Sequence, residues 1–150
     1  MTTQTLERQQ ILPLPPEEAF AFFADALRLE AITPPWLHFR VLTPAPIAMR
    51  AGTEIEYRLR LHGVPVRWLT RIEVWEPGRR FVDRQLRGPY SVWHHTHSFE
   101  PHPDGTSMRD LVRYALPLGA LGRVAGGAFV RRDLERIFDF RHEAIAAQLG

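Results

Sequence analysis

The chain has 150 residues, 45% of them hydrophobic and 24% charged, which is enough for one domain with a substantial buried core. Its lack of cysteine excludes disulfides and zinc sites built from thiolates. All 19 basic residues are arginine, yet the net charge is only +2, so we expect no strong positive field and no nucleic-acid partner.

The first part of the chain predicts a strand, a helix and a second strand. Leu6 to Leu14 has the composition of a short opening strand that a cluster of prolines ends. Pro16 and the two glutamates after it suit a helix N-terminus, because proline loses no hydrogen bond there and the acids interact favourably with the helix dipole. Apolar residues recur at helical spacing to about Ala31, and the tetrapeptide TPPW at 33–36 stops the helix. His38 to Leu42 predicts the second strand.

The middle of the chain predicts an antiparallel meander. Thr53 to Leu61 alternates apolar with charged residues, which is typical of a strand with one buried and one solvated face. Val64 to Trp75 is the next strand, and Thr106 to Leu116 is the last. Turn signals separate the strands at 62–63, 77–78, 88–89 and 104–105. One face of the strand from 64 to 75 is expected to hold Trp68, Thr70, Ile72 and Val74.

The segment from Phe81 to Phe99 is the most informative part of the meander. It predicts two strands joined at Gly88-Pro89. Since strand side chains alternate between faces, one face collects polar and aromatic residues together: Phe81, Asp83 and Gln85 on the first strand, and Trp93, His95, His97 and Phe99 on the second. Such a mixture is neither a plain core nor a plain solvent face, and it indicates the wall of a semi-polar cavity.

After Pro117 the pattern predicts one helix to the end of the chain, with an apolar stripe long enough to lie across a sheet. The stripe consists of Leu121, Ala125, Ala128, Leu134, Phe138 and Ile145. Glycines weaken its first half, so we predict that Gly119 to Gly127 is a mobile gate. The fold prediction is therefore α+β: an antiparallel curved sheet of about seven strands around a long C-terminal helix, with two short helices after the first strand.

The candidate site is the set of polar and aromatic residues on the concave side of this sheet. Its members are Tyr57, Asp83, Gln85, Trp93, His95, His97, Asp110 and Tyr114. They form a hydrogen-bonded network that fixes strand register, or they line a ligand cavity, and the two roles are compatible. Tyr57 either closes the cavity or packs in the core. We expect a histidine neighbour to keep Asp110 ionised, because an unpaired buried carboxylate is costly. The other tryptophans are expected in the core.

A metal site is a further alternative for this face. His95 and His97 form an H-x-H pair, and Asp83 or Asp110 could supply the third ligand that zinc usually needs. No second histidine motif supports it, so we predict no metal and no other cofactor. A phosphate-binding loop is also absent, because Gly119 to Gly127 lacks the lysine of a Walker motif.

The order of elements resembles the helix-grip fold of the SRPBCC superfamily, which includes START lipid-transfer domains, birch-pollen-allergen-like proteins and polyketide cyclases. A closer resemblance is to the bacterial ligand-binding SRPBCC branch, and it covers essentially all of residues 1–150 as one domain. It is carried by TPPWLHF at 33–39, FVDRQ at 81–85, GPY at 88–90, WHHTHSF at 93–99, GTSMRD at 105–110, Tyr114 and IFDFR at 137–141.

The resemblance implies binding of a small, largely hydrophobic molecule between the sheet and the C-terminal helix, in a carrier or a sensor. One alternative is an enzyme of the polyketide cyclase or dehydratase type, with His95 or Asp110 as base and Tyr114 as proton donor. Another is an interaction protein with a vestigial pocket. The sequence leaves a homodimer open.

The termini and apolar runs bear on location. MTTQTLERQQ at the start has no apolar core of a signal peptide. No apolar run approaches the ~20 residues that a membrane span needs. We therefore expect a cytoplasmic protein without a transmembrane segment.

Overall fold

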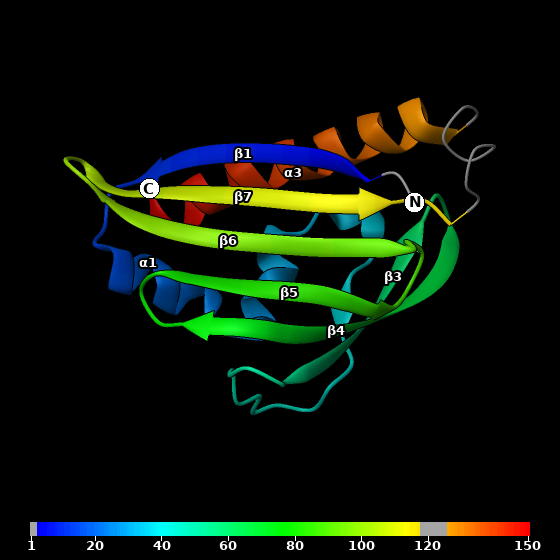
Figure 1. The fold of residues 1–150 in the computed structure, drawn as a ribbon, viewed down its shortest axis with the longest axis horizontal. Coiled ribbons are helices and arrows are strands. Elements are labelled where there is room, and N and C mark those ends of the chain that lie inside the picture. The colour runs from blue at the N-terminus through cyan, green and yellow to red at the C-terminus, as the bar shows by residue number, and fades with distance from the viewer. Residues whose placement is uncertain (1–2, 118–125) are drawn as a thin grey trace.

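The computed structural model describes residues 3–117 and 126–150, which form one curved antiparallel sheet with helices on its concave side (Figure 1). The strand order is β1-β7-β6-β5-β4-β3-β2. The strands are β1 (Gln4–Leu12), β2 (Arg40–Val41), β3 (Glu54–Leu61), β4 (Val64–Glu76), β5 (Arg80–Arg87), β6 (Val92–His102) and β7 (Gly105–Ala115). The helices are α1 (Pro16–Phe23), the 3₁₀ helices η1 (Ala26–Ile32) and η2 (Pro35–Leu37), and α3 (Gly127–Leu149). The predicted helix-grip fold is confirmed.

Tight turns join the strands from β3 to β7 into a meander. Gly63 and Gly78 have φ angles of 83° and 76°, which glycine adopts without the steric cost of a Cβ. The turn into β7 depends on Gly105, where a Cβ would clash with the Leu12 carbonyl oxygen. This close approach lets β1 pair with β7 along its whole length, from Gln4 opposite Tyr114 to Leu12 opposite Thr106.

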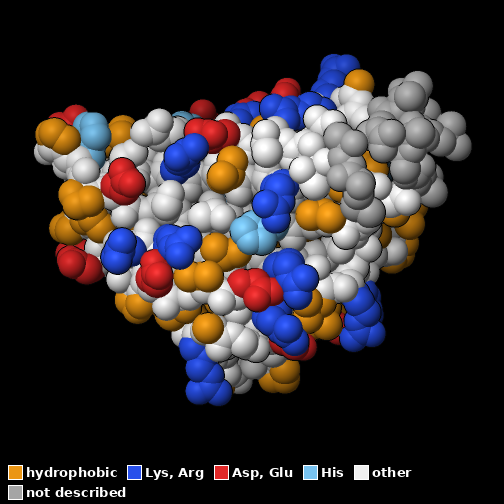
Figure 2. Space-filling model, in the orientation of Figure 1, with side chains coloured by type: hydrophobic (Ala, Val, Ile, Leu, Met, Phe, Trp, Pro, Cys, Tyr) orange, Lys and Arg blue, Asp and Glu red, His pale blue; other side chains and the backbone are white. Residues whose placement is uncertain are grey.

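The outer face of the sheet carries many charged side chains, with hydrophobic ones between them (Figure 2). Arginines and acids lie side by side on it (Figure 2), and several form ion pairs, as Arg84 does with Glu73 at 2.5 Å and Arg109 with Glu7 at 2.9 Å. Alternation along the strands thus places the arginine–acid pairs on the outer face and the residues of the core and the cavity on the inner face.

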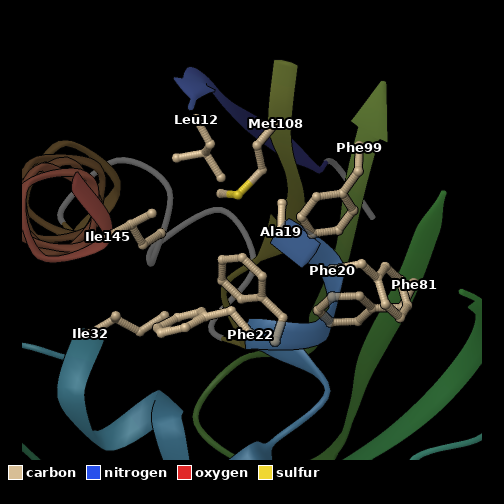
Figure 3. Packing of buried hydrophobic residues seen from close by; sticks show 10 residues of the cluster. Leu12, Ala19, Phe20, Phe22, Ile32, Phe81, Phe99, Met108 and Ile145 are labelled. Atoms are coloured by element: carbon tan, nitrogen blue, oxygen red, sulfur yellow. The ribbon is translucent and has the colours of Figure 1, made fainter. Parts of the chain in front are cut away.

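An aromatic cluster fills the space between α1, the sheet and the C-terminal part of α3 (Figure 3). Phe20 of α1 makes edge contacts with Phe81 and Phe99, at ring-centroid distances of 5.8 and 5.4 Å. Ile145 of α3 closes the cluster from the other side and is fully buried. This packing anchors α3 by its C-terminal half, and the rest of the helix lies over the candidate site.

Three predictions of secondary structure or strand register were wrong. The first helix ends at Phe23 rather than near Ala31, because the Asp25 side chain accepts a hydrogen bond from the Leu27 amide and starts the separate helix η1. The second strand keeps only Arg40–Val41, since His38 adopts a left-handed conformation with φ of 47°.

The third wrong prediction concerns β4. Its pairing with β5 shifts between Ile72 and Val74, so Val74 leaves the inward face and Trp75 turns toward Phe20, with ring centroids 4.8 Å apart.

Trp36 also departs from the prediction, because it is 42% exposed rather than in the core. The predicted gate from Gly119 to Gly127 lies outside the described residues except at its last two positions. In the described ranges, no helix is long and apolar enough to cross a membrane.

Candidate functional site

A cavity of about 170 Å³ lies between the concave face of the sheet, the two 3₁₀ helices and α3. Most of its wall is apolar and aromatic, with Leu29 and Ile32 from η1, Leu59 and Leu61 from β3, and Phe138 from α3. A polar wall faces these residues, formed by side chains of β5 and β6 together with Arg141. The site is therefore a concave apolar pocket with a few placed polar groups, as ligand sites usually are.

The polar wall is built by strand register. On β5 and β6, Asp83 lies opposite His95, and on β6 and β7, His97 lies opposite Asp110. The hydrogen bonds run diagonally: Nε2 of His95 lies 2.8 Å from Oδ1 of Asp110, and Nε2 of His97 lies 2.6 Å from Oδ2 of Asp83. The two imidazole rings stack with centroids 3.6 Å apart, so each histidine fixes the orientation of the other.

Arg141 of α3 completes the polar wall from the opposite side. A terminal guanidinium nitrogen lies 3.4 Å from Oδ1 of Asp110 and 3.4 Å from Nδ1 of His97. The residue is 9% exposed, and its Nε has no hydrogen-bond partner among the described residues. The guanidinium also lies over the rings of Phe23 and Phe138, at 5.4 and 6.0 Å from their centroids.

The two carboxyl groups of the wall are held ionised. Burial alone would raise the pKa of Asp83, but the hydrogen bond from His97 and the neighbouring positive charges outweigh it and lower that pKa. Burial also acts to raise the pKa of Asp110. The charge of Arg141 and the hydrogen bonds from both histidines outweigh it and hold that pKa well below its usual range.

The pKa values of the two histidines shift in opposite directions. Burial lowers the pKa of His95, and the charge of His97 lowers it further. Burial also opposes protonation of His97, but its hydrogen bonds to Asp110 and Asp83 outweigh this effect and raise its pKa. We therefore assign the positive charge of the pair to His97, which has a carboxylate near each ring nitrogen. Two carboxylates then face one imidazolium and Arg141, and the charges of the wall balance.

A neutral His95 has a defined tautomer. Its Nε2 donates to Asp110, which leaves Nδ1 as an acceptor, 3.9 Å from Oδ2 of Asp83. That separation is too long for a hydrogen bond. The arrangement leaves an imidazole nitrogen able to accept a proton or a hydrogen bond beside the cavity.

Two tyrosines flank the polar wall in their neutral form. Burial raises the pKa of Tyr57, and the charge of Asp83 raises it further. Burial likewise raises the pKa of Tyr90. Next to Tyr57, the indole nitrogen of Trp68 donates to Oγ1 of Thr70 at 3.0 Å. These groups offer hydroxyl hydrogen bonds at the cavity without adding charge.

Comparison with known families identifies the chain. The family model for polyketide cyclase / dehydrase and lipid transport proteins matches residues 12–140. The chain belongs to this family. It is thus a member of the SRPBCC superfamily, as the resemblance predicted.

Solved structures with this fold agree with that assignment. They include a Chromobacterium violaceum protein (17% identity, TM-score 0.74, covering 97% of this chain and 96% of that one). Ara h 8.0201 is similar (15% identity, TM-score 0.72, covering 99% of this chain and 98% of that one). The Zhui aromatase/cyclase of Streptomyces sp. R1128 is similar as well (16% identity, TM-score 0.70, covering 99% of this chain and 94% of that one). At such identities the likeness shows the fold alone. No curated protein matches the sequence significantly.

The residues predicted for the site of this SRPBCC protein fall into two groups. The group that lines the cavity is Tyr57, Asp83, Trp93, His95 and His97. The others lie outside it. Asp110 is behind the two histidines, and Tyr114 is buried in a neighbouring cluster, near Tyr90. Gln85 bonds the amide and the carbonyl of Tyr90 at 3.1 and 2.7 Å, so it fixes the turn between β5 and β6.

Sequence reasoning missed Arg141. It follows Leu134 and Phe138 at helical spacing on the buried stripe of α3, and an arginine in such a stripe signals a buried partner. Phe39 was missed as well, because the left-handed His38 before it sets the direction of the chain.

Asp83, His95 and His97 offer ligand atoms within 4.8 Å of one another, the spacing of a metal site. Their geometry fits a hydrogen-bond network better. A metal ion lies near the plane of each imidazole that binds it, whereas these rings are stacked, with 26° between their planes. His97 also uses Nε2 for the 2.6 Å bond to Asp83. The absence of a metal remains a prediction, which the effect of zinc on Tm would test.

Proposed function

We propose that this SRPBCC protein is a carrier or sensor that binds a small, largely hydrophobic ligand in the cavity beneath α3. The family supports a hydrophobic-ligand-binding domain. The observation that carries the proposal is the pocket of about 170 Å³, whose apolar walls meet a single charge-balanced polar wall. Because the charges of this wall balance, an uncharged apolar ligand body can displace water from the cavity without leaving an unpaired buried charge.

The polar wall favours ligands with hydroxyl groups. Nδ1 of His95 accepts a hydrogen bond, and the Asp83 side chain, 19% exposed, has acceptor capacity beside it. A ligand hydroxyl placed between them would donate its one hydrogen bond to either of them. The aromatic rings of Trp68 and Trp93, in edge contact at 5.1 Å, would cover a flat apolar body.

Titration with the uncharged fluorophore phenylnaphthylamine tests for an open apolar cavity. We expect Leu61→Trp, which fills the cavity from its rim, to weaken binding about tenfold or more. The matched control is Leu27→Trp, since Leu27 is 43% exposed and lies outside the cavity lining. Native mass spectrometry of the protein from its own host identifies the natural ligand. A parent protein that binds neither the fluorophore nor any host molecule would refute the proposal.

An enzyme of the polyketide cyclase or dehydratase type is the second candidate, favoured by the His95–Asp110 pair. Asp110 orients His95 through Nε2 at 2.8 Å, so Nδ1 would act as the base beside the cavity. Tyr57 rather than Tyr114 would supply a proton, because Tyr57 lines the cavity. Turnover of a bound host molecule, lost in His95→Gln, distinguishes an enzyme from a carrier. An open cavity disfavours the third alternative, an interaction protein with a vestigial pocket.

A further inference from the structure

Three arginines of β2 and β3 surround a hollow on the outer side of the sheet edge. Arg40, Arg58 and Arg60 are all exposed and line a groove of about 610 Å³. Arg40 lies directly opposite Arg58 in the antiparallel pair of β2 and β3. Like charges placed directly opposite each other on neighbouring strands are destabilising.

Among the described residues, no acid forms an ion pair with these arginines. The acids at the other end of β3 have other partners: Glu54 pairs with Arg71 at 2.9 Å, and Glu56 pairs with Arg67 at 2.6 Å. Within residues 3–117 and 126–150, none of the three groove arginines forms an ion pair. A cluster of free guanidinium groups around a hollow is a suitable site for an anion, because each presents a fork of donors to carboxylate, sulfonate or phosphate oxygens.

The arginine groove adjoins the ligand cavity. Phe39 lines both hollows, and its ring packs on Tyr57 with centroids 4.9 Å apart. Alternation along β3 sends Leu59 toward the cavity and Arg60 toward the groove. In the described chain, β2 pairs with β3 only as far as Arg58, so the last residues of β3 have no strand partner on the side of Phe39. A molecule passing this edge would reach from one hollow to the other.

We propose that the arginine groove holds the anionic group of the ligand whose apolar body lies in the cavity. The ligand is then an amphiphile with an apolar, hydroxyl-bearing end at His95 and a carboxylate, sulfate or phosphate at Arg58. This inference rests on the proposed function, since it assigns a second binding region to the same ligand.

Two fluorophores with the same apolar body test the proposal. Anilinonaphthalene sulfonate carries an anion, and phenylnaphthylamine is its uncharged counterpart. We expect Arg58→Gln to weaken binding of the sulfonate about tenfold and to leave binding of the uncharged probe unchanged. The control is Arg79→Gln, which removes the same charge from an exposed arginine outside the groove and should change neither affinity. Inorganic phosphate should displace the sulfonate and spare the uncharged probe.

The possible outcomes separate the two proposals. If neither probe binds the parent, the cavity proposal itself fails. If both bind and Arg58→Gln changes neither, or if it acts no more strongly than Arg79→Gln, the anionic subsite is overturned. If Arg58→Gln spares both probes and also abolishes binding to vesicles of anionic phospholipid, the groove is a membrane contact and not a subsite of the ligand.

Discussion

Arg141 is the residue whose removal should most disturb the site. The Arg141→Met variant keeps an unbranched side chain of similar reach over Phe138 but removes the cation beside Asp110. The buried wall then holds two carboxylates and one imidazolium, a net charge of −1. The substitution therefore tests whether the charges of the wall balance as assigned.

The size of the effect follows from the geometry. At 3.4 Å and an effective dielectric constant near 20, the attraction between Arg141 and Asp110 is about 5 kcal/mol. Removing one partner of a buried pair typically costs ~3–5 kcal/mol, because the other charge stays buried. Proton uptake by His95, 2.8 Å from Asp110, would recover part of this loss. We expect a loss of about 3 kcal/mol in the free energy of unfolding, or roughly 6–12 °C in Tm.

The pH dependence of this loss is diagnostic. In the parent, His95 has a lowered pKa and destabilises the fold as pH drops below about 6.5, whereas the raised pKa of His97 acts in the opposite direction. In Arg141→Met both pKa values should lie above the unfolded value. Protonation of the two histidines then stabilises the folded state, and this stabilisation is complete below about pH 6.5 and is lost as the pH rises through the folded pKa values. The deficit relative to the parent should thus be larger at pH 8 than at pH 5.5.

Urea unfolding of parent and variant across this pH range measures the effect. The control is Arg132→Met, an exposed position on the same helix, which we expect to change stability by less than about 0.5 kcal/mol. A variant as stable as the parent, or a deficit that does not change with pH, would show that the wall is not charge-balanced through Arg141.

Three further predictions concern the polar wall and the residues around it. Because the pKa values of Asp83 and Asp110 are lowered, the stability that they contribute is present above about pH 4 and is lost as the pH falls through the folded pKa values. The free energy of unfolding in urea should therefore fall less between pH 5 and pH 3 in Asp110→Asn than in the parent. An equal fall in both proteins would contradict this prediction. Tyr114→Phe should leave the affinity for phenylnaphthylamine unchanged, since Tyr114 lies outside the cavity, and a weaker affinity in titration would place Tyr114 at the ligand. Gln85→Ala should lower the free energy of unfolding by about 1–3 kcal/mol, because it removes two hydrogen bonds to the turn, and an unchanged Tm would contradict this. One equivalent of zinc should not change Tm after chelator treatment; a rise of several degrees that depends on His95 would establish a metal site.

Much of the fold could be predicted because its signals are local. Turn residues and two-residue alternation specify the meander without knowledge of long-range contacts. The bulge after Ile72 could not be found in this way, since it depends on Trp75 packing against Phe20 of α1, far away in the chain. The early end of the first helix could have been predicted, because aspartate is a favoured N-cap residue and the Asp25 side chain accepts a hydrogen bond from the Leu27 amide at the start of η1.

The candidate site was harder to predict than the fold. Alternation assigns a residue to a face but does not give its position along the strand or its depth. Trp93 and Tyr114 lie opposite each other on β6 and β7, yet only Trp93 lines the cavity. Arg141 was missed for a different reason, because charged residues of an amphipathic helix are assigned outward unless a buried partner is known. Only the packing of α3 on the sheet brings that partner, Asp110, within 3.4 Å.

The protonation of His95 is the feature that weighs most between a carrier and an enzyme. A lowered pKa keeps the imidazole neutral near pH 7, so Nδ1 is free to accept, but the same shift makes it a weaker base. A weak base abstracts a proton readily only from an acidic group, whereas a neutral acceptor binds a hydroxyl without any proton transfer. Burial and the charge of His97 cause the shift, and both would persist with ligand bound. The wall therefore suits recognition of a hydroxylated apolar molecule better than proton abstraction from carbon.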